Sequence, residues 1–373
     1  MDKVQLGQRL ADARDLAGMT QESVARAVGL DRTAIVLLEK GERNLKVPEL
    51  VEIARVLGRP LAYFVDPPVP AAVSRRAAPG SNHDSTRMLD VELEQFASDI
   101  RGLLRLDLVK AVTRDPTSRT PRTHMEAERA AERFRRDAGL ASDPIDDLGR
   151  VCEHFGLYVF AAAMGVGGPD GGCVEVDSGA ATAGAAVING DAGSGRRRMT
   201  AAHELGHWLF GDAYDTGATS ESEQMINSFA IHFLAPRAGV IATWSKDRER
   251  TLRDRAMSVG VTYRLSWSAT IAQLRNLDLI STQDRDRLSI HEPRAGDYLR
   301  LGMAWRDEFQ APYLSPAFVA GCLDGYACSR ITQARVLELL RGIVSAEQLP
   351  HVEPASVDTL RSAFEGSSQR RVW

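Results

Sequence analysis

Residues 196–210 read RRRMTAAHELGHWLF, and no other segment of this 373-residue chain carries as much chemical information. On a helix, His203 and His207 lie four residues apart, so both imidazoles project from one face about one turn from each other. This is the separation at which two histidines hold one zinc ion. The segment therefore predicts a helix that contributes two metal ligands.

Glu204 follows the first of these histidines. About 100° of helix rotation separates it from His203, so its carboxylate can lie beside the metal without displacing an imidazole. It would take a proton from a water molecule at the zinc ion and pass it to the leaving amine. Leu205, Trp208 and Leu209 form an apolar side that buries the helix, and a buried His beside a buried Glu needs a partner such as a metal. The alternative is an exposed polar helix face.

A third ligand is expected from a later helix, because a catalytic zinc site takes three protein ligands and leaves one position open. Residues 221–233 have the spacing of a helix with one buried stripe. We expect Glu223 to be the third ligand, and Asn227 to orient a ligand histidine or the helix pair. Glu221 is the rival ligand, and a solvated acidic helix start is the alternative for Glu223. His232 lies too far round the helix to join Glu223.

Short apolar runs before the histidine-bearing helix indicate a small sheet. Residues 157–160, 173–176 and 185–188 have the length and composition of strands. A glycine-rich loop, residues 165–172, separates the first two. Because helical patterns surround them, the sequence predicts a mainly α fold with a small β-sheet, of the α+β class.

The first 66 residues predict four short helices. Thr20 can cap the second helix and Asp31 the third, and Gly29 between them can take a positive φ cheaply. Gly41 ends the third helix. Two helices joined by a glycine turn, and braced by a first and a fourth, form a helix-turn-helix unit.

This N-terminal pattern resembles the Xre family of phage-repressor-like helix-turn-helix domains, over nearly all of residues 1–66. The resemblance implies that Gln21, Arg32 and Thr33 approach phosphates or base edges. It also implies that Arg43 approaches the DNA backbone. The residues that carry it are Leu10, Arg14, Thr20-Gln21-Glu22, Val24-Ala25, Gly29-Leu30, Ile35, Leu38-Glu39, Gly41 and the Pro48 to Leu57 stretch.

Val36 and Leu37 depart from the Xre pattern, because such helices usually present polar groups to the groove at these positions. They would either contact thymine methyl groups or mark a face for protein contact. A helix-turn-helix fold that binds protein rather than DNA is therefore the alternative.

The metal-site residues resemble the ImmA/IrrE family of zincin-type metallopeptidases, over roughly residues 141–280. The resemblance implies zinc held by His203, His207 and Glu223, with Glu204 as the base, and an activity that cleaves Xre-type repressors and so releases transcription. Ile226 stands where the usual motif has Ala, a conservative change. The matching residues are Arg198-x-Thr200-x-Ala202-His203-Glu204-Leu205-Gly206-His207, then Glu223-x-x-x-Asn227-x-Phe229-Ala230 and Phe233-Leu234-Ala235-Pro236, followed by a small helical piece at Val259 to Ile280.

These observations divide the chain into a helix-turn-helix domain at 1–66, a Pro- and Ala-rich linker at 67–86 and a helical connector at 87–140. The metallopeptidase domain follows at 141–280. The remaining residues, 281–373, are expected to be helical, and they contain no motif that assigns a role.

The composition of the chain bears on its location and on its possible partners. The net charge is −4, so nucleic-acid binding must come from a local surface. The longest apolar stretch is about half a membrane span, and the polar N-terminus lacks the apolar core of a signal peptide. We therefore expect a cytoplasmic protein with no membrane partner. Its cysteines form no Cys-x-x-Cys pair and are expected to be reduced thiols: Cys152, Cys173, Cys322 and Cys328.

Two functions follow from the sequence. In the first, the chain is a zinc endopeptidase that cuts a repressor, and its helix-turn-helix domain brings it to an operator, where a homodimer is expected by analogy. In the second, it is a transcription factor whose metallopeptidase fold is a sensing or dimerising module. Cleavage of its own linker near residues 71–78 is a weaker variant of the first.

Overall fold

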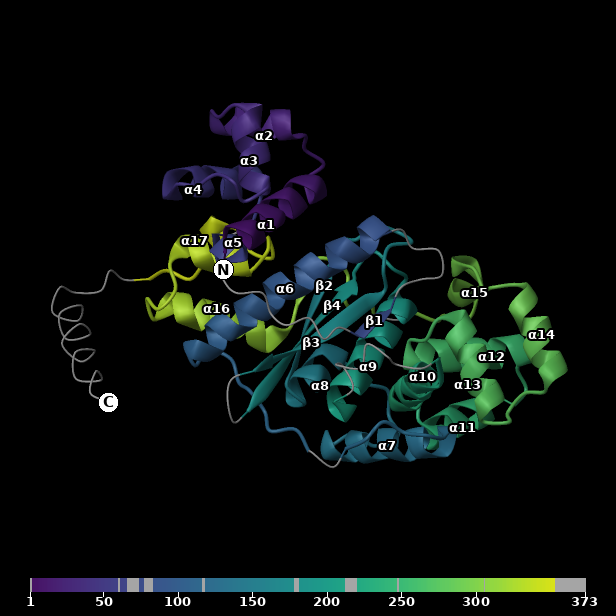
Figure 1. The fold of residues 1–373 in the computed structure, drawn as a ribbon. Helices are drawn as coiled ribbons and strands as arrows, with labels where there is room; N and C mark the ends of the chain where they lie inside the picture. Colours follow the sequence, from purple (N-terminus) through teal and green to yellow (C-terminus); the bar gives the residue numbers. More distant parts are fainter. Residues whose placement is uncertain are drawn as a thin grey trace.

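The computed structural model describes residues 2–59, 61–65, 74–76, 83–115, 118–177, 181–211, 220–246, 248–304 and 306–352. Helices surround one small mixed sheet (Figure 1), which confirms the α+β class expected from the sequence. No single helix among the described residues is long and apolar enough to cross a membrane, and only the bent pair Glu221–Leu234 and Arg237–Lys246 passes by length and composition.

Short helices form the N-terminal part: α1 (Lys3–Leu16), α2 (Gln21–Val28), α3 (Arg32–Glu39), α4 (Val47–Val56) and α5 (Leu61–Val65). Caps fix where α2 and α3 begin, because the Thr20 hydroxyl accepts a 3.1 Å hydrogen bond from Ser23 N and the Asp31 carboxylate accepts a 2.6 Å bond from Ala34 N. Gly29 ends α2 with a φ of 70°. These are the predicted cap and turn positions. The buried core comprises Leu10, Ala13, Val24, Ala25, Ile35, Leu38, Ile53, Ala54, Leu57, Tyr63 and Phe64, together with Val91 from a later helix.

One sheet organises the rest of the described chain, with strand order β1-β3-β4-β2-β5. The inner strands β2 and β4 are parallel, and β3 is antiparallel to β4. The short strands β1 and β5 lie antiparallel at the two edges. The three predicted strands lie within β2, β3 and β4. The bounds are β1 (Ser74–Arg76), β2 (Leu157–Ala162), β3 (Gly171–Asp177), β4 (Thr182–Asn189) and β5 (Tyr313–Leu314).

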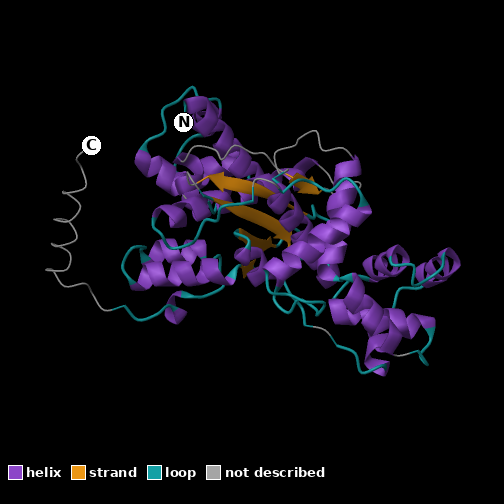
Figure 2. Ribbon diagram, turned by 90° about the horizontal axis from the view of Figure 1, so that it is seen from below, coloured by secondary structure: helices purple, strands orange, loops and turns teal. Residues whose placement is uncertain are grey.

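Helices cover both faces of this sheet (Figure 2), and β2 and β4 are therefore buried along nearly their whole length. One face packs on α6 (His83–Arg105), α16 (Pro316–Ala327) and α17 (Gln333–Leu339). On the other face, α8 (Leu148–His154) and α9 (Ser194–Phe210) lie against the sheet. The remaining helices extend the same buried cluster outward: α7 (His124–Asp137), α10 (Ser220–Leu234), α11 (Arg237–Lys246), α12 (Leu252–Tyr263), α13 (Trp267–Asn276) and α14 (Thr282–Ile290), with α15 (Ala295–Arg300) at its end.

Helix α6 is shared between the N-terminal bundle and the sheet. Its apolar stripe, which includes Leu93 and Phe96, packs on the sheet as part of one buried cluster. Its other side meets the bundle, where Glu94 forms an ion pair with Arg9 and Glu92 lies 3.0 Å from Arg59 Nη1. The helix therefore links the bundle physically to the sheet.

The segments outside the two expected domains contribute more than their predicted roles suggest. Residues 67–86, predicted as a linker, contain strand β1 and the start of α6, and 67–73 and 77–82 lie outside the described residues. The possible self-cleavage region, 71–78, is accordingly described only at β1. Residues 281–373, predicted as a helical region without a role, supply β5 and two helices over the sheet. The domain boundaries themselves stay predictions.

Candidate metal centre

Helix α9 is buried along almost its whole length, and two glycines permit this. A Cβ on Gly195 would lie 2.2 Å from the backbone nitrogen of Ser266, so only glycine fits there. A Cβ on Gly206 would lie 3.0 Å from Phe229 and 3.1 Å from Ile226, both on α10. Gly206, the residue just before His207, therefore allows α9 and α10 to approach each other closely.

Three side chains converge at this helix pair. The Nε2 atoms of His203 and His207 lie 3.0 Å apart, and both imidazoles project from the same face of α9. Glu223, on the first turn of α10, places Oε2 3.3 Å from His203 Nε2 and Oε1 3.4 Å from His207 Nε2. Ligand atoms of all three lie within 4.8 Å of one another, so the group could hold one metal ion.

The environment keeps the third side chain ionised. The histidines are 0 % and 2 % exposed, whereas the side chain of Glu223 is 37 % exposed and opens the cluster toward solvent. Hydrogen bonds with His203, and then with His207, hold the pKa of Glu223 well below its usual range. A carboxylate in this state accepts a cation without first losing a proton.

Asn227 stands behind the first histidine, one turn after Glu223 on α10. Its Oδ1 lies 3.1 Å from Nδ1 of His203, and its Nδ2 donates a 2.9 Å hydrogen bond to the backbone carbonyl of Glu223. An acceptor at Nδ1 fixes the ring so that Nε2 faces the cluster. The structure therefore brings together the three expected ligands and the residue expected to orient one of them.

Glu204 is 0 % exposed, like the histidine before it. Its backbone carbonyl contacts the thiol of Cys173 on β3, with Sγ and O 3.6 Å apart. The rival ligand, Glu221, is exposed at the start of α10 and lies outside the described cluster. His232 is also outside it: the ring is 4 % exposed and Nδ1 lies 3.3 Å from Nε2 of Gln273.

An ion-pair network at the start of α9 was not foreseen from the sequence. Arg198 is 1 % exposed, forms an ion pair with Glu308 and donates a 3.1 Å hydrogen bond to the Ile145 carbonyl. Arg264 also reaches Glu308, at 3.2 Å. Burial lowers the pKa of Arg198 to about 9. The sequence placed Arg198 in the ImmA/IrrE-like motif but gave no sign of its partner, because Glu308 lies far along the chain.

The residues expected at DNA differ in their surroundings. Arg32 and Thr33 are exposed at the start of α3. Gln21 donates a 2.7 Å hydrogen bond to Glu39, and Arg43 lies 2.7 Å from Glu49. The hydrogen bond from Arg43 lowers the pKa of Glu49.

A hollow of about 670 Å³ lies at the start of α2 and α3. Val36 and Leu37, the apolar departures from the Xre pattern, are half-buried rather than fully exposed on α3. The lining residues of the hollow are Arg14, Met19, Thr20, Gln21, Glu22 and Arg32.

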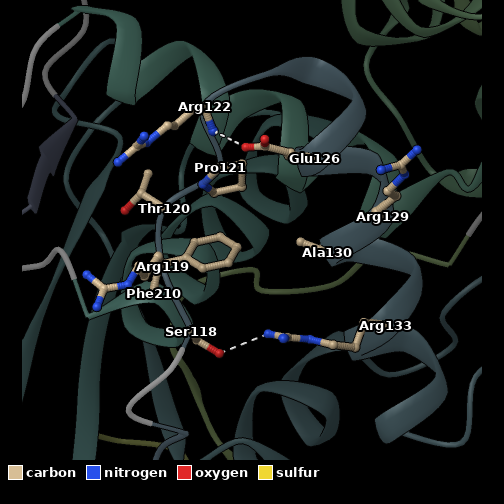
Figure 3. Close-up of a pocket in the computed structure, with 10 residues that line it drawn as sticks. All are labelled: Ser118, Arg119, Thr120, Pro121, Arg122, Glu126, Arg129, Ala130, Arg133 and Phe210. Atoms are coloured by element: carbon tan, nitrogen blue, oxygen red, sulfur yellow. Dashed lines mark hydrogen bonds between the residues drawn. The ribbon is translucent and has the colours of Figure 1, made fainter.

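A further pocket, of about 520 Å³, lies between the 118–122 loop and α7, beside Phe210 at the end of α9. Arg133 Nη2 closes one end with a 2.8 Å hydrogen bond to the Ser118 hydroxyl. The other labelled arginines point away from the space between loop and helix, and the Phe210 ring points into it (Figure 3). The lining therefore gathers no convergent set of charges for a ligand.

Comparison with known families agrees with this architecture. Residues 10–64 match a helix-turn-helix family, and residues 152–270 match the IrrE N-terminal-like domain. The chain is therefore a fusion of an Xre-like helix-turn-helix domain and an ImmA/IrrE-like metallopeptidase-type domain. The three converging side chains all lie inside the second match. No curated protein matches the chain.

Proposed function

We propose that this chain is a cytoplasmic, DNA-binding regulator whose ImmA/IrrE-like domain is a zinc-dependent endopeptidase that cleaves a repressor or another regulatory protein. The observation that carries the proposal is the convergence of His203, His207 and Glu223 within 4.8 Å. Two imidazole nitrogens and one carboxylate are a donor set that zinc takes in catalytic sites, with a fourth position left open. The partial exposure of Glu223 leaves the cluster accessible from one side.

Each residue of the candidate centre would have its own role in peptide hydrolysis. When bound, zinc supplies Lewis acidity that activates water and polarises a peptide carbonyl. His203, His207 and Glu223 would hold the ion, and Asn227 would fix the orientation of the first imidazole. Glu204 would hold a proton at its carboxylate between its removal from water and its delivery to the leaving amine.

The test uses the purified full-length chain and the Xre-type repressor encoded nearest its gene. About one zinc ion per chain is expected, together with cleavage of the repressor that a zinc chelator stops and added zinc restores. Zinc without cleavage, with DNA binding intact, would instead favour a sensing or dimerising module. A chain that takes up no zinc would contradict both readings.

DNA binding is tested through Arg32, which is exposed at the start of α3. Arg32→Ala should weaken binding to the DNA upstream of the chain's own gene by about 1 kcal/mol or more, and reduce the salt dependence by about one phosphate contact. The matched control is Arg55→Ala, whose side chain is 69 % exposed on α4 and pairs with Glu52. Equal affinities for the two variants, measured by fluorescence anisotropy at several salt concentrations, would contradict this placement.

A further inference from the structure

The outer edge of β3 carries a short strand from the segment that connects the two family matches. Ser74 pairs with Cys173, Arg75 with Gly172 and Arg76 with Gly171, in antiparallel register. The inner edge of β3 is occupied by β4. Along the outer edge of Val174–Asp177, no described strand pairs with β3. The connecting segment therefore pairs with one end of a sheet edge that no other described strand occupies.

The covered end of β3 is the end next to the histidine-bearing helix. The thiol of Cys173 contacts the Glu204 carbonyl at 3.6 Å. A Cβ on Gly171 would lie 2.8 Å from the side chain of Thr200, so backbone and helix are in close contact there. Figure 1 shows β1 beside β3, and β3 in turn packs against α9. The three residues of β1 thus pair with the end of β3 that contacts the histidine-bearing helix.

We propose that the outer edge of β3 is a peptide-docking edge and that Ser74–Arg76 fill it in cis, so that the chain competes with its own peptide substrates. Extended peptides bind open sheet edges through main-chain hydrogen bonds, which tolerate many sequences. The competition with substrates rests on the proposed peptidase function, but the occupancy of the edge does not.

The pairing of Ser74–Arg76 with β3 would block this edge reversibly. A tethered segment has an effective concentration in the millimolar range, which outcompetes a free peptide at micromolar concentration. A strand of three residues makes few ladder bonds, so a longer peptide can displace it. No described strand pairs with the outer edge of Val174–Asp177, so such a peptide can start pairing there. A protein substrate that presents a longer extended segment would therefore open the site.

The register identifies which amides of β1 face β3. The Asn189 amide donates a 2.8 Å hydrogen bond to the Asp170 carbonyl, so these two residues form a hydrogen-bonded pair between β4 and the start of β3. Bonding directions alternate along a strand, so the backbone groups of Gly171 and Cys173 face β1 instead. Their partners Arg76 and Ser74 direct their amides toward β3, whereas the Arg75 amide faces away.

This alternation supplies a matched pair of variants. Arg76→Pro removes an amide that faces β3, while Arg75→Pro places proline where the edge tolerates it, and both remove one arginine. The probe is a fluorescein-labelled peptide of residues 70–80, PAAVSRRAAPG. Anisotropy is measured on the full chain with EDTA present, so that neither zinc nor cleavage enters the result. Arg76→Pro is expected to bind the peptide at least tenfold more tightly than wild type or Arg75→Pro.

Ser74→Pro is the second variant and should behave like Arg76→Pro. Equal binding by all four proteins, or no binding by any, overturns the proposal, provided that circular dichroism shows the same fold in each. Because the metal is absent, tighter binding by Arg76→Pro stands even if the zinc-loaded chain cleaves no repressor. In that case the peptidase function fails and the docking edge remains. If cleavage occurs, Arg76→Pro should also raise kcat/KM at least tenfold over Arg75→Pro.

Discussion

Glu204→Gln is expected to lower the rate of repressor cleavage by about 10²- to 10⁴-fold while leaving the zinc content unchanged, because an amide cannot carry the proton that a general base transfers. The substitution keeps the shape of the side chain, which matters because Glu204 is 0 % exposed and neighbours the first histidine. The three expected ligands are untouched, so metal binding and chemistry can be separated in one variant.

The control for this experiment is Glu221→Gln, which changes an exposed glutamate outside the described cluster. Its cleavage rate and zinc content should equal those of wild type. Single-turnover rates with a fixed excess of enzyme measure both variants on one scale. Full activity in Glu204→Gln, or a loss of zinc in Glu221→Gln, would show that the roles of these two carboxylates are assigned wrongly.

The first part of the candidate centre could be predicted because it depends on local geometry alone. An i, i+4 pair on one helix fixes the two imidazoles relative to each other, and the structure places their Nε2 atoms 3.0 Å apart. The third side chain was harder to predict, because both Glu221 and Glu223 begin the same helix. The rotation of α10 against α9 distinguishes them, and it depends on packing at Gly206, which no short motif reports.

The fold, likewise, could be predicted only where the local sequence pattern is strong. The buried runs within β2, β3 and β4 were predicted as strands, since their apolar length is a strong signal. The edge strands β1 and β5 have three and two residues, too few for any periodic pattern. Similarly, the ion pair between Arg198 and Glu308 connects α9 to residues that had no assigned role. Long-range pairing of this kind has no signature in a single sequence.

His207→Ala is expected to reduce zinc affinity by more than about 100-fold. Substituting an outer residue that orients a metal ligand typically costs about 10- to 100-fold in affinity, and removing a ligand outright costs more. The remaining histidine and Glu223 would leave two protein ligands of three. Asn227→Ala should reduce zinc affinity by only about 10- to 100-fold. It removes the acceptor 3.1 Å from His203 Nδ1 but no ligand atom.

His232→Ala provides the control for cavity formation. This histidine is also buried, at 4 % exposed, and lies on the helix that carries Glu223, but its partner is Gln273. Its removal leaves a hole of similar size in the same layer, so it should destabilise the chain without changing zinc affinity. Competition with a chromophoric chelator measures the zinc affinity of wild type, His207→Ala, Asn227→Ala and His232→Ala under one condition. Equal zinc loss from His207→Ala and His232→Ala would mean that the metal responds to packing in this layer, and that the converging side chains are not its ligands.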